Sequence, residues 1–205
     1  MTDRKGNLIV FSGPSGSGKG TILKQLLDNY PELNAAVSVS ATTRQPRPGE
    51  VDGVNYYFLD KSEFESRIDN GGFYEWAKFC DNYYGTPKAE VLKQLDAGID
   101  VILEIEVQGA MKIKEQVPDC VMIFVIPPSF KELKNRLINR GTEQDDVINK
   151  RIETAMSEVE YIKHYTYVII NDDLDTAVKQ LAGILDTEHL KVINNTKNIQ
   201  EVCKL

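Results

Sequence analysis

The stretch GPSGSGKG at residues 13–20 is the sequence feature that most constrains the fold. It directly follows the short apolar run LIVFS (8–12) and directly precedes an amphipathic stretch that starts near Lys19. A strand, a glycine-rich turn and a helix in that order form a phosphate-binding loop, because the glycines let backbone N–H groups point at phosphate oxygens and the helix adds its positive end. The stretch therefore predicts a nucleotide-binding α/β protein in which Lys19 reaches the β- and γ-phosphates.

The loop departs from the usual pattern at its last residue. Ser or Thr normally follows the lysine, because its hydroxyl holds Mg²⁺, whereas this chain has Gly20. Mg²⁺ dehydrates reluctantly and can be held by phosphates and water, and Thr21 offers a hydroxyl one residue later. Switch-type hydrolases and motors use the loop hydroxyl to tie mobile segments to the metal. The departure favours a nucleotide kinase, and a glycine-rich turn without a ligand stays open as the alternative.

Short apolar runs alternate with longer amphipathic stretches, which indicates βαβ units around a parallel sheet. The expected strands are 8–12, 37–40, 101–106, 121–126 and 167–171. The expected helices are about 19–30, about 144–161, about 174–189 and one that begins at Ser129 with a capping box to Glu132.

Residues 41–98 interrupt this rhythm with the Pro- and Gly-rich RQPRPGEVDG and several aromatic-rich pieces. They predict a β-rich insertion with one helix, capped at Ser62 together with Glu65. The polar and charged stretch NRGTEQDD at 139–146 predicts a mobile flap between two helices. No pattern assigns a structure to 191–205.

Composition excludes several classes of protein. With 205 residues the chain fits one domain and can bury roughly 70% of its unfolded surface. A net charge of −7 argues against a protein that coats nucleic acid. The longest apolar run, 121–126, is too short to span a bilayer. The odd number and wide spacing of the cysteines fit a reducing, cytoplasmic location, with all three as packing or surface residues: Cys80, Cys120 and Cys203.

A kinase also needs a site for its acceptor, and the insertion offers candidates. Arg44 and Arg47 stand three apart beside two prolines, and Tyr56 and Tyr84 add phenolic hydroxyls. A guanidinium group matches two phosphate oxygens at once, which makes the two arginines candidates for a second anion site. A solvated basic loop is the alternative.

Glu75 is a candidate for reading a base, and two further acidic residues stand where α/β proteins bind ligands. Glu75 stands among large apolar residues in FYEWA, either as a surface charge or as the acceptor for the N1–H and the exocyclic amine of guanine. Adenine lacks that pair of donors, so such a carboxylate would reject it. Glu104 and Glu106 alternate with apolar residues at the end of a predicted central strand, where α/β proteins bind ligands.

The chain closely resembles bacterial guanylate kinases over about residues 7–189. The matching pieces, in the order of that family, are GPSGSGKGT, SVSATTRQPRPGEVDGVNYYF, FYEWAKFCDNYYGTP, VILEIEVQGA, NRGTE, NKRI and VIINDD. The resemblance implies a P-loop nucleoside monophosphate kinase fold and the reaction ATP + GMP to ADP + GDP with Mg²⁺, in purine metabolism and GMP recycling. It also implies dGMP as a further acceptor.

The resemblance divides the chain into parts. A kinase domain would span 5–190 and a tail 191–205. Within the domain, the resemblance implies a parallel-sheet core at 5–40, 99–128 and 158–190, a GMP-binding insertion at 41–98 and a lid at 129–157.

The resemblance also assigns roles to residues. Around the guanine it places Ser40, Glu75, Thr86 and Glu106, and on the GMP phosphate Arg44, Arg47, Tyr56 and Tyr84. On ATP it places Gly13, Pro14, Ser15, Gly16, Ser17, Gly18, Lys19, Gly20, Thr21 and Arg136, with Asn171 near the adenine. The residues implied in catalysis are Lys19, Arg44, Arg140 and Arg151.

Some of these positions have a second interpretation. Thr86 also fits the N-cap of a helix that starts with Pro87. Arg136 and Arg140 lie one helical turn apart, and a solvated basic face is the alternative for them. We expect no direct protein ligand for the metal unless Thr21 supplies one, and we expect both histidines, His164 and His189, to be structural.

An acceptor that is already a phosphate anion needs no general base, so catalysis would consist of alignment and charge neutralisation. Two rival functions stay open: a kinase for another monophosphate such as AMP or thymidylate, and an inactive binding module. The intact glycines and lysine of the loop argue against the module. The expected partners are ATP and GMP, without nucleic acid or membrane, and the sequence leaves a monomer and a homo-oligomer equally open.

Overall fold

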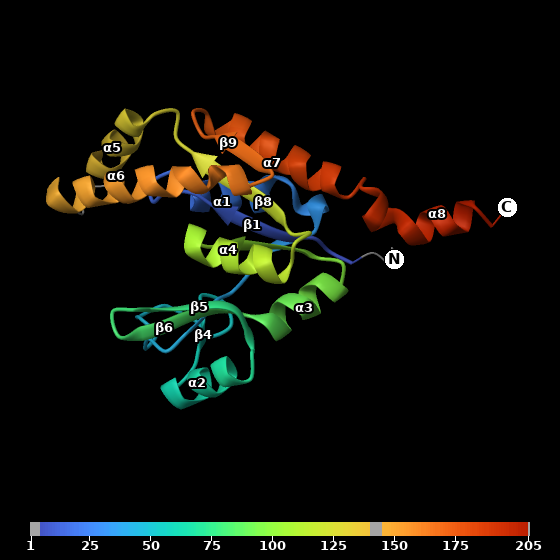
Figure 1. The fold of residues 1–205 in the computed structure, drawn as a ribbon, viewed down its shortest axis with the longest axis horizontal. Helices are drawn as coiled ribbons and strands as arrows, with labels where there is room; N and C mark the ends of the chain where they lie inside the picture. The colour runs from blue at the N-terminus through green and yellow to red at the C-terminus, as the bar shows by residue number, and fades with distance from the viewer. Residues whose placement is uncertain (1–4, 140–144, 205) are drawn as a thin grey trace.

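The computed structural model describes residues 5–139 and 145–204, and its centre is a five-stranded sheet (Figure 1). The strand order is β2-β7-β1-β8-β9, and every neighbouring pair is parallel. The α/β class expected from the sequence is therefore confirmed. The strands are β1 (Leu8–Ser12), β2 (Ala35–Val37), β7 (Asp100–Glu104), β8 (Val121–Ile126) and β9 (Tyr167–Ile170).

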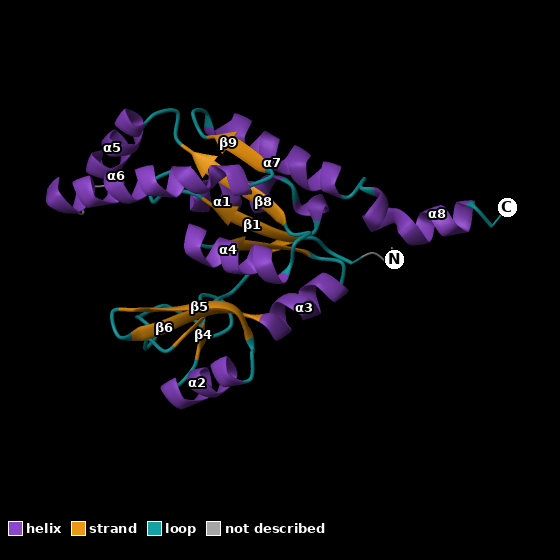
Figure 2. Ribbon diagram, viewed as in Figure 1, coloured by secondary structure: helices purple, strands orange, loops and turns teal. Residues whose placement is uncertain are grey.

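Helices cover both faces of this sheet (Figure 2). Ile9 and Phe11 of β1 point into the apolar layer under α1 and α7, whereas Leu8 and Val10 point into the layer under α3 and α4. Because the strand is buried on both faces, it is a continuous apolar run and does not alternate with polar residues. The four helices are α1 (Lys19–Asn29), α3 (Lys88–Asp96), α4 (Val107–Gln116) and α7 (Leu174–Glu188).

Between β2 and β7 the chain forms a second, four-stranded sheet, here called the small sheet, in the order β4-β3-β6-β5. Phe64 anchors its helix: the ring stacks on Phe73 at 4.3 Å and on Tyr83 at 5.3 Å between centroids. These side chains form an apolar cluster separate from the two layers of the large sheet. The elements are β3 (Ala41–Thr42), β4 (Tyr57–Phe58), α2 (Lys61–Asp69), β5 (Phe73–Phe79) and β6 (Asn82–Pro87).

A separate helical unit, made of α5 and α6, follows β8, and a short tail follows α7. α5 and α6 pack against each other through Leu133, Leu137 and Ile148. The tail, to which the sequence assigned no structure, forms a short helix that extends from the body (Figure 1). The elements are α5 (Phe130–Asn139), α6 (Asp145–Val159), α8 (Thr196–Val202) and three 3-10 helices, η1 (Pro31–Leu33), η2 (Glu160–His164) and η3 (Val192–Asn195).

Polar contacts join the two ends of the described chain at the amino edge of the large sheet. The Asn7 backbone N–H donates to Asp100 Oδ1 at 2.8 Å, and His189 Nε2 lies 2.7 Å from Asp100 Oδ2. The Asn7 amide lies 3.0 Å from His189 Nδ1. Since His189 is only 8% exposed and fully engaged far from the loop, its expected structural role agrees with its position.

Several expected boundaries were wrong. The strand expected at 37–40 lies at Ala35–Val37, and the strand expected at 101–106 ends at Glu104, so that Glu106 is the N-cap position of α4. Glu104, the last residue of β7, and Glu106 are both exposed. Ser62 is not the cap of α2, because Asp60 occupies that position and accepts from the Glu63 N–H at 2.8 Å.

Other expectations agree with the structure in part. Ser129 Oγ accepts from the Glu132 N–H at 3.1 Å, as a capping box requires, but the Glu132 carboxylate contacts Arg136 and leaves the box half closed. Of the flap expected at 139–146, residues 140–144 lie outside the described residues. Over the described ranges, no helix is long and apolar enough to cross a membrane.

We predict that Phe64→Ala lowers the free energy of unfolding of the small sheet by about 3–5 kcal/mol, because it removes a fully buried ring and both of its stacking contacts. Phe79→Ala is the control, since that ring is 69% exposed, and it should change stability by no more than about 0.5 kcal/mol. Urea unfolding followed by hydrogen exchange measures both. Equal effects of the two substitutions would contradict the assignment of a separate core to the small sheet.

Candidate functional site

The glycine-rich loop joins the end of β1 to α1 in a conformation that only glycine adopts readily. Gly13 has φ 146° and Gly18 has φ 91°. A Cβ on Gly13 would lie 2.0 Å from the Val125 carbonyl oxygen, and one on Gly18 would lie 2.3 Å from Asn171 Nδ2. The loop is therefore packed directly against β8 and the end of β9, which fixes its shape before any ligand arrives.

Lys19 lies folded over this loop. Its Nζ donates to the Gly13 carbonyl at 2.6 Å and to the Pro14 carbonyl at 3.2 Å. The ammonium group is thus held at the mouth of the loop, at the first residue of α1, where the helix dipole also favours an anion. The arrangement suits a ligand with several negatively charged oxygens.

Beside the loop is a pocket of about 420 Å³. Asn171 forms part of its floor, and its buried amide donates to the Ser17 carbonyl at 2.8 Å. Arg136 closes one side, held by the Asn171 carbonyl at 3.0 Å and by Glu132 at 3.0 Å. The lining residues are Gly16, Gly18, Thr21, Arg136, Asn139, Asn171, Asp172 and Leu174.

The helical unit of α5 and α6 reaches the loop through arginines. Arg151 of α6 donates to Ser15 Oγ at 2.6 Å, so it bridges this unit and the phosphate loop. Arg136 contacts the backbone at the end of β9, which is not the behaviour of a freely solvated basic face. Arg140 lies outside the described residues.

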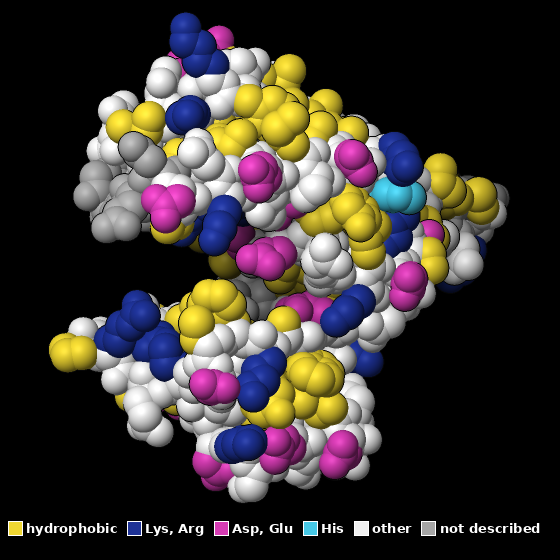
Figure 3. Space-filling model, turned by 60° about the vertical axis from the view of Figure 1, so that its left-hand side comes forward, with side chains coloured by type: hydrophobic (Ala, Val, Ile, Leu, Met, Phe, Trp, Pro, Cys, Tyr) yellow, Lys and Arg dark blue, Asp and Glu magenta, His cyan; other side chains and the backbone are white. Residues whose placement is uncertain are grey.

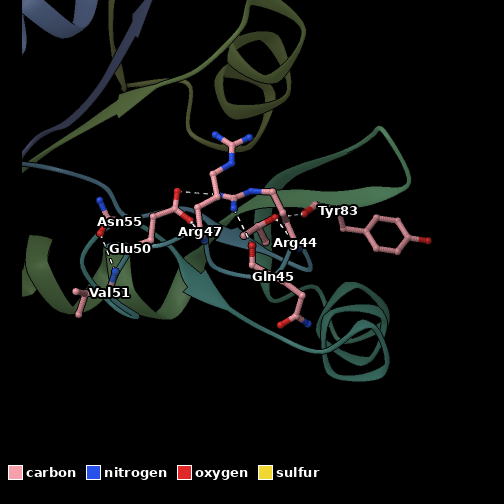
Figure 4. Close-up of polar contacts among 8 residues, drawn as sticks. Arg44, Gln45, Arg47, Glu50, Val51, Asn55 and Tyr83 are labelled. Atoms are coloured by element: carbon pink, nitrogen blue, oxygen red, sulfur yellow. Dashed lines mark hydrogen bonds and ion pairs between the residues drawn. The ribbon is translucent and has the colours of Figure 1, made fainter.

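In the segment between β3 and β4, Arg44 is held by an acid that sequence reasoning did not identify. Its Nη2 donates to Glu50 Oε1 at 2.8 Å, while Glu50 Oε2 accepts from the Arg47 backbone N–H at 2.7 Å (Figure 4). The Arg44 guanidinium also lies over the Tyr56 ring, 5.4 Å from its centroid. The only signal for Glu50 is its place in the same Pro- and Gly-rich loop, six residues after Arg44.

These contacts have electrostatic consequences. The hydrogen bond from Arg44, followed by that from the Arg47 backbone, holds the pKa of Glu50 below its usual value. The Arg47 side chain is exposed and points away from Glu50 (Figure 4). One arginine of the predicted anion site is therefore held by an acid, whereas the side chain of the other is exposed.

A second pocket, of about 450 Å³, lies between the small sheet and the start of α4. It brings together five of the eight residues predicted to contact the acceptor: Ser40, Tyr56, Glu75, Tyr84 and Glu106. Arg44 and Arg47 are not among its lining residues, and Thr86 takes part through its bond to Glu75. Figure 3 shows the hollow between the two halves of the molecule, with acidic and basic side chains along its edges.

Glu75 owes its orientation to a β-bulge. One extra residue on β5 shifts the ladder with β6, whose register runs Phe73↔Pro87 and then Trp76↔Gly85. Tyr74 and Glu75 therefore lie opposite Thr86 alone, and the Glu75 side chain turns toward the pocket. Sequence patterns do not reveal a bulge of this kind, because no glycine marks the bulged strand at this point.

Thr86 fixes the Glu75 carboxylate. Its hydroxyl donates to Glu75 Oε1 at 2.7 Å. The alternative role of Thr86 as a helix cap was wrong, since β6 continues to Pro87 and α3 begins at Lys88. Burial raises the pKa of Glu75, while Thr86 and then Lys112 oppose that shift.

A further acid near the loop was missed by sequence reasoning. Glu158 of α6 is half-buried, and its Oε2 is fully buried without a hydrogen-bond partner among the described residues. Burial raises the pKa of Glu158, and attraction to Lys19 opposes that shift. An acid in an amphipathic helix gives no sequence signal for such a place.

The family model for Guanylate kinase matches residues 5–188. The guanylate kinase of Clostridioides difficile is 53% identical over 199 residues, covering 97% of this chain and 96% of that protein. That of Caldanaerobacter subterraneus subsp. tengcongensis is 52% identical over 192 residues, covering 94% and 92%. The crystal structure of guanylate kinase from Anaplasma phagocytophilum matches with a TM-score of 0.71 at 33% identity, covering 93% of this chain and 90% of that chain.

We predict that Glu75→Gln raises the melting temperature at neutral pH. Because folding raises the pKa of Glu75 above its ordinary value of 4.5, its contribution to stability is present below that value and lost as the pH rises through the raised pKa. Gln keeps an acceptor for Thr86 without the buried charge. The advantage of the variant should therefore shrink toward acid pH, as thermal unfolding between pH 4 and 8 measures. A less stable variant at pH 7 would contradict the assigned cost of the charge.

Proposed function

This chain belongs to the guanylate kinase family, and we propose that the cleft between its two sheets is where a phosphoryl group passes from ATP to GMP. The chain is an ATP-dependent phosphotransferase with the reaction ATP + GMP to ADP + GDP. The observation that best supports this use of the cleft is the buried Glu75 carboxylate, held by Thr86 in a pocket of its own, across from the phosphate loop.

GMP binds in the 450 Å³ pocket. Glu75 accepts hydrogen bonds from the guanine N1–H and exocyclic amine, with Ser40, Thr86 and Glu106 beside it. The residues for the GMP phosphate are Arg44, Arg47, Tyr56 and Tyr84. Since the contacts go to the base and the phosphate, dGMP serves as a second acceptor.

ATP binds on the other side of the cleft. Backbone N–H groups of residues 13–20 surround its phosphates, Lys19 moves from the loop carbonyls to phosphate oxygens, and the 420 Å³ pocket with Asn171 takes the adenine. Arg136 and Arg151 reach the same region from α5 and α6. Arg140, outside the described residues, completes this set in the proposal.

The chain aligns two anions and needs no general base, because the GMP phosphate is already ionised. Lys19, Arg44, Arg140 and Arg151 neutralise charge on the transferred group and hold donor and acceptor in line. Closure of the insertion (41–98) and the lid (129–157) over the core excludes water, which would otherwise take the phosphoryl group. The boundaries of the insertion and of the lid, and those of the kinase domain at 5–190, are part of the proposal.

Phosphoryl transfer from ATP implies a divalent metal, and we propose Mg²⁺. The residues present fit a metal carried in by the nucleotide: Gly20 has no hydroxyl, whereas Thr21 is exposed on α1 and lines the ATP pocket. Mg²⁺ usually keeps several waters and phosphate ligands, so one hydroxyl from the chain is enough. When bound, the metal neutralises phosphate charge.

The acceptor assignment is tested by ADP release from purified protein with ATP and each of GMP, AMP, CMP and UMP. Thymidylate is tested as well, because a kinase for another monophosphate is the rival function. GMP should be the preferred acceptor, and GMP-independent ADP release would contradict the proposal. Glu75→Gln should lower kcat/KM for GMP by about 100-fold, because the amide cannot accept from both guanine donors. Glu201→Gln, exposed on α8, is the matched control and should leave it unchanged.

We predict that Lys19→Met lowers kcat by at least about 100-fold, because the lysine acts on charge at the phosphates. The variant should still fold, because the hydrogen bonds that Lys19 donates to the Gly13 and Pro14 carbonyls lie in the loop, outside the apolar layers of the large sheet. Lys24→Met, exposed on the same helix, is the control. Steady-state kinetics and thermal unfolding separate the outcomes, and near-normal turnover of Lys19→Met would refute this role of the loop.

A further inference from the structure

α4 lies between the large sheet and the β5–β6 hairpin (Figure 1) and contacts β5, the strand that carries Glu75. Three of its residues, Gly109, Lys112 and Gln116, are spaced by three and four positions and so share one face of the helix. Each lies next to a different one of three consecutive residues of β5. Gly109 lies next to Glu75, Lys112 next to Trp76 and Gln116 next to Tyr74. One face of the helix therefore lies against all three residues at the bulge.

Two of these contacts hold the backbone on either side of Glu75. Gln116 Nε2 donates to the Tyr74 carbonyl at 2.5 Å, and Lys112 Nζ donates to the Trp76 carbonyl at 3.4 Å. The bulge interrupts the ladder with β6 at this point, so the Gln116 amide supplies a partner for a carbonyl beside the interruption. The bulged conformation is thus fixed from the helix side.

Gly109 acts on the Glu75 side chain itself. A Cβ at this position would lie 3.3 Å from both Glu75 Cγ and Glu75 Oε2. Those atoms cannot simply retreat, because Thr86 holds the other carboxylate oxygen at 2.7 Å. Alanine is the better helix former, so helix formation does not explain a glycine in α4.

We propose that α4 is the template that positions the base-reading carboxylate, and that Gly109 is a specificity-positioning residue whose missing side chain leaves the space that Glu75 occupies. The inference rests on the proposed role of Glu75 in reading guanine. It adds a residue that lines the same pocket and acts through the position of Glu75.

The test compares Gly109→Ala with Gly183→Ala. Gly183 lies within α7, and a Cβ there meets nothing within 4 Å, so both variants gain the better helix former while only one crowds Glu75. Gly109→Ala should raise KM for GMP by about 3- to 10-fold, because a displacement of a few tenths of an ångström misaligns two hydrogen bonds. KM for ATP and the melting temperature should equal those of Gly183→Ala within error. This result would separate a positioning role from a loss of structure.

Specificity gives a second readout. IMP keeps the N1–H of guanine but lacks the exocyclic amine, so the preference for GMP over IMP reports on the second hydrogen bond to Glu75. Gly109→Ala should narrow that preference, and Gly183→Ala should not. In a Glu75→Gln background, Gly109→Ala should change kcat/KM for GMP by less than about twofold, because the two residues act through one interaction.

The outcomes are distinguishable. If Glu75→Gln impairs GMP turnover but Gly109→Ala changes neither KM for GMP nor the GMP-to-IMP ratio, the template is refuted and the role of Glu75 stands. Parallel rises in KM for both substrates with a lower melting temperature would also refute it, in favour of a structural role. If Glu75→Gln itself is without effect, the base-reading role fails and the inference fails with it.

Discussion

The parallel pairing of β1 with β7 on one side and β8 on the other is the constraint on which the site depends. In a parallel sheet the carboxyl ends of neighbouring strands meet at one edge. β1 ends in the phosphate loop, β7 ends at Glu104 just before α4, and β8 leads to α5. The parallel pairing of these three strands therefore brings the phosphate loop, α4 and the α5–α6 unit to the same edge of the sheet, although these segments are far apart in the sequence.

The molecule separates this rigid edge from parts with cores of their own. The large sheet has two buried apolar layers, whereas the small sheet depends on the cluster around Phe64 and the α5–α6 unit on the cluster around Leu133. Parts with separate cores can shift against one another without breaking either core. α4 connects the large sheet to β5, so motion of the small sheet must keep or remake the contacts at Gln116 and Lys112.

Sequence patterns predicted what depends on local order. The loop, β1 and β8 were located correctly, because a glycine-rich turn and double burial leave marks in consecutive residues. The patterns failed where a distant partner decides: Thr86 bonds to Glu75 across a ladder and does not cap a helix, and Glu50 matters because the chain folds back on Arg44. Asp60 displaced Ser62 as a cap because both residues suit that position and sequence alone does not rank them. The roles of the site residues in binding and catalysis stay predictions.

The bulge in β5 has an evolutionary consequence. Tyr74 and Glu75 share one partner, Thr86, so removal of Tyr74 would restore the regular ladder while Trp76 stayed opposite Gly85. Every amino acid of the pocket would still be encoded, yet Glu75 would lose the bulge that turns its side chain toward the pocket. With Glu75 as the proposed base reader, acceptor choice depends on the length of a strand as well as on its composition, and single-codon deletions are a route by which a relative could lose or change it.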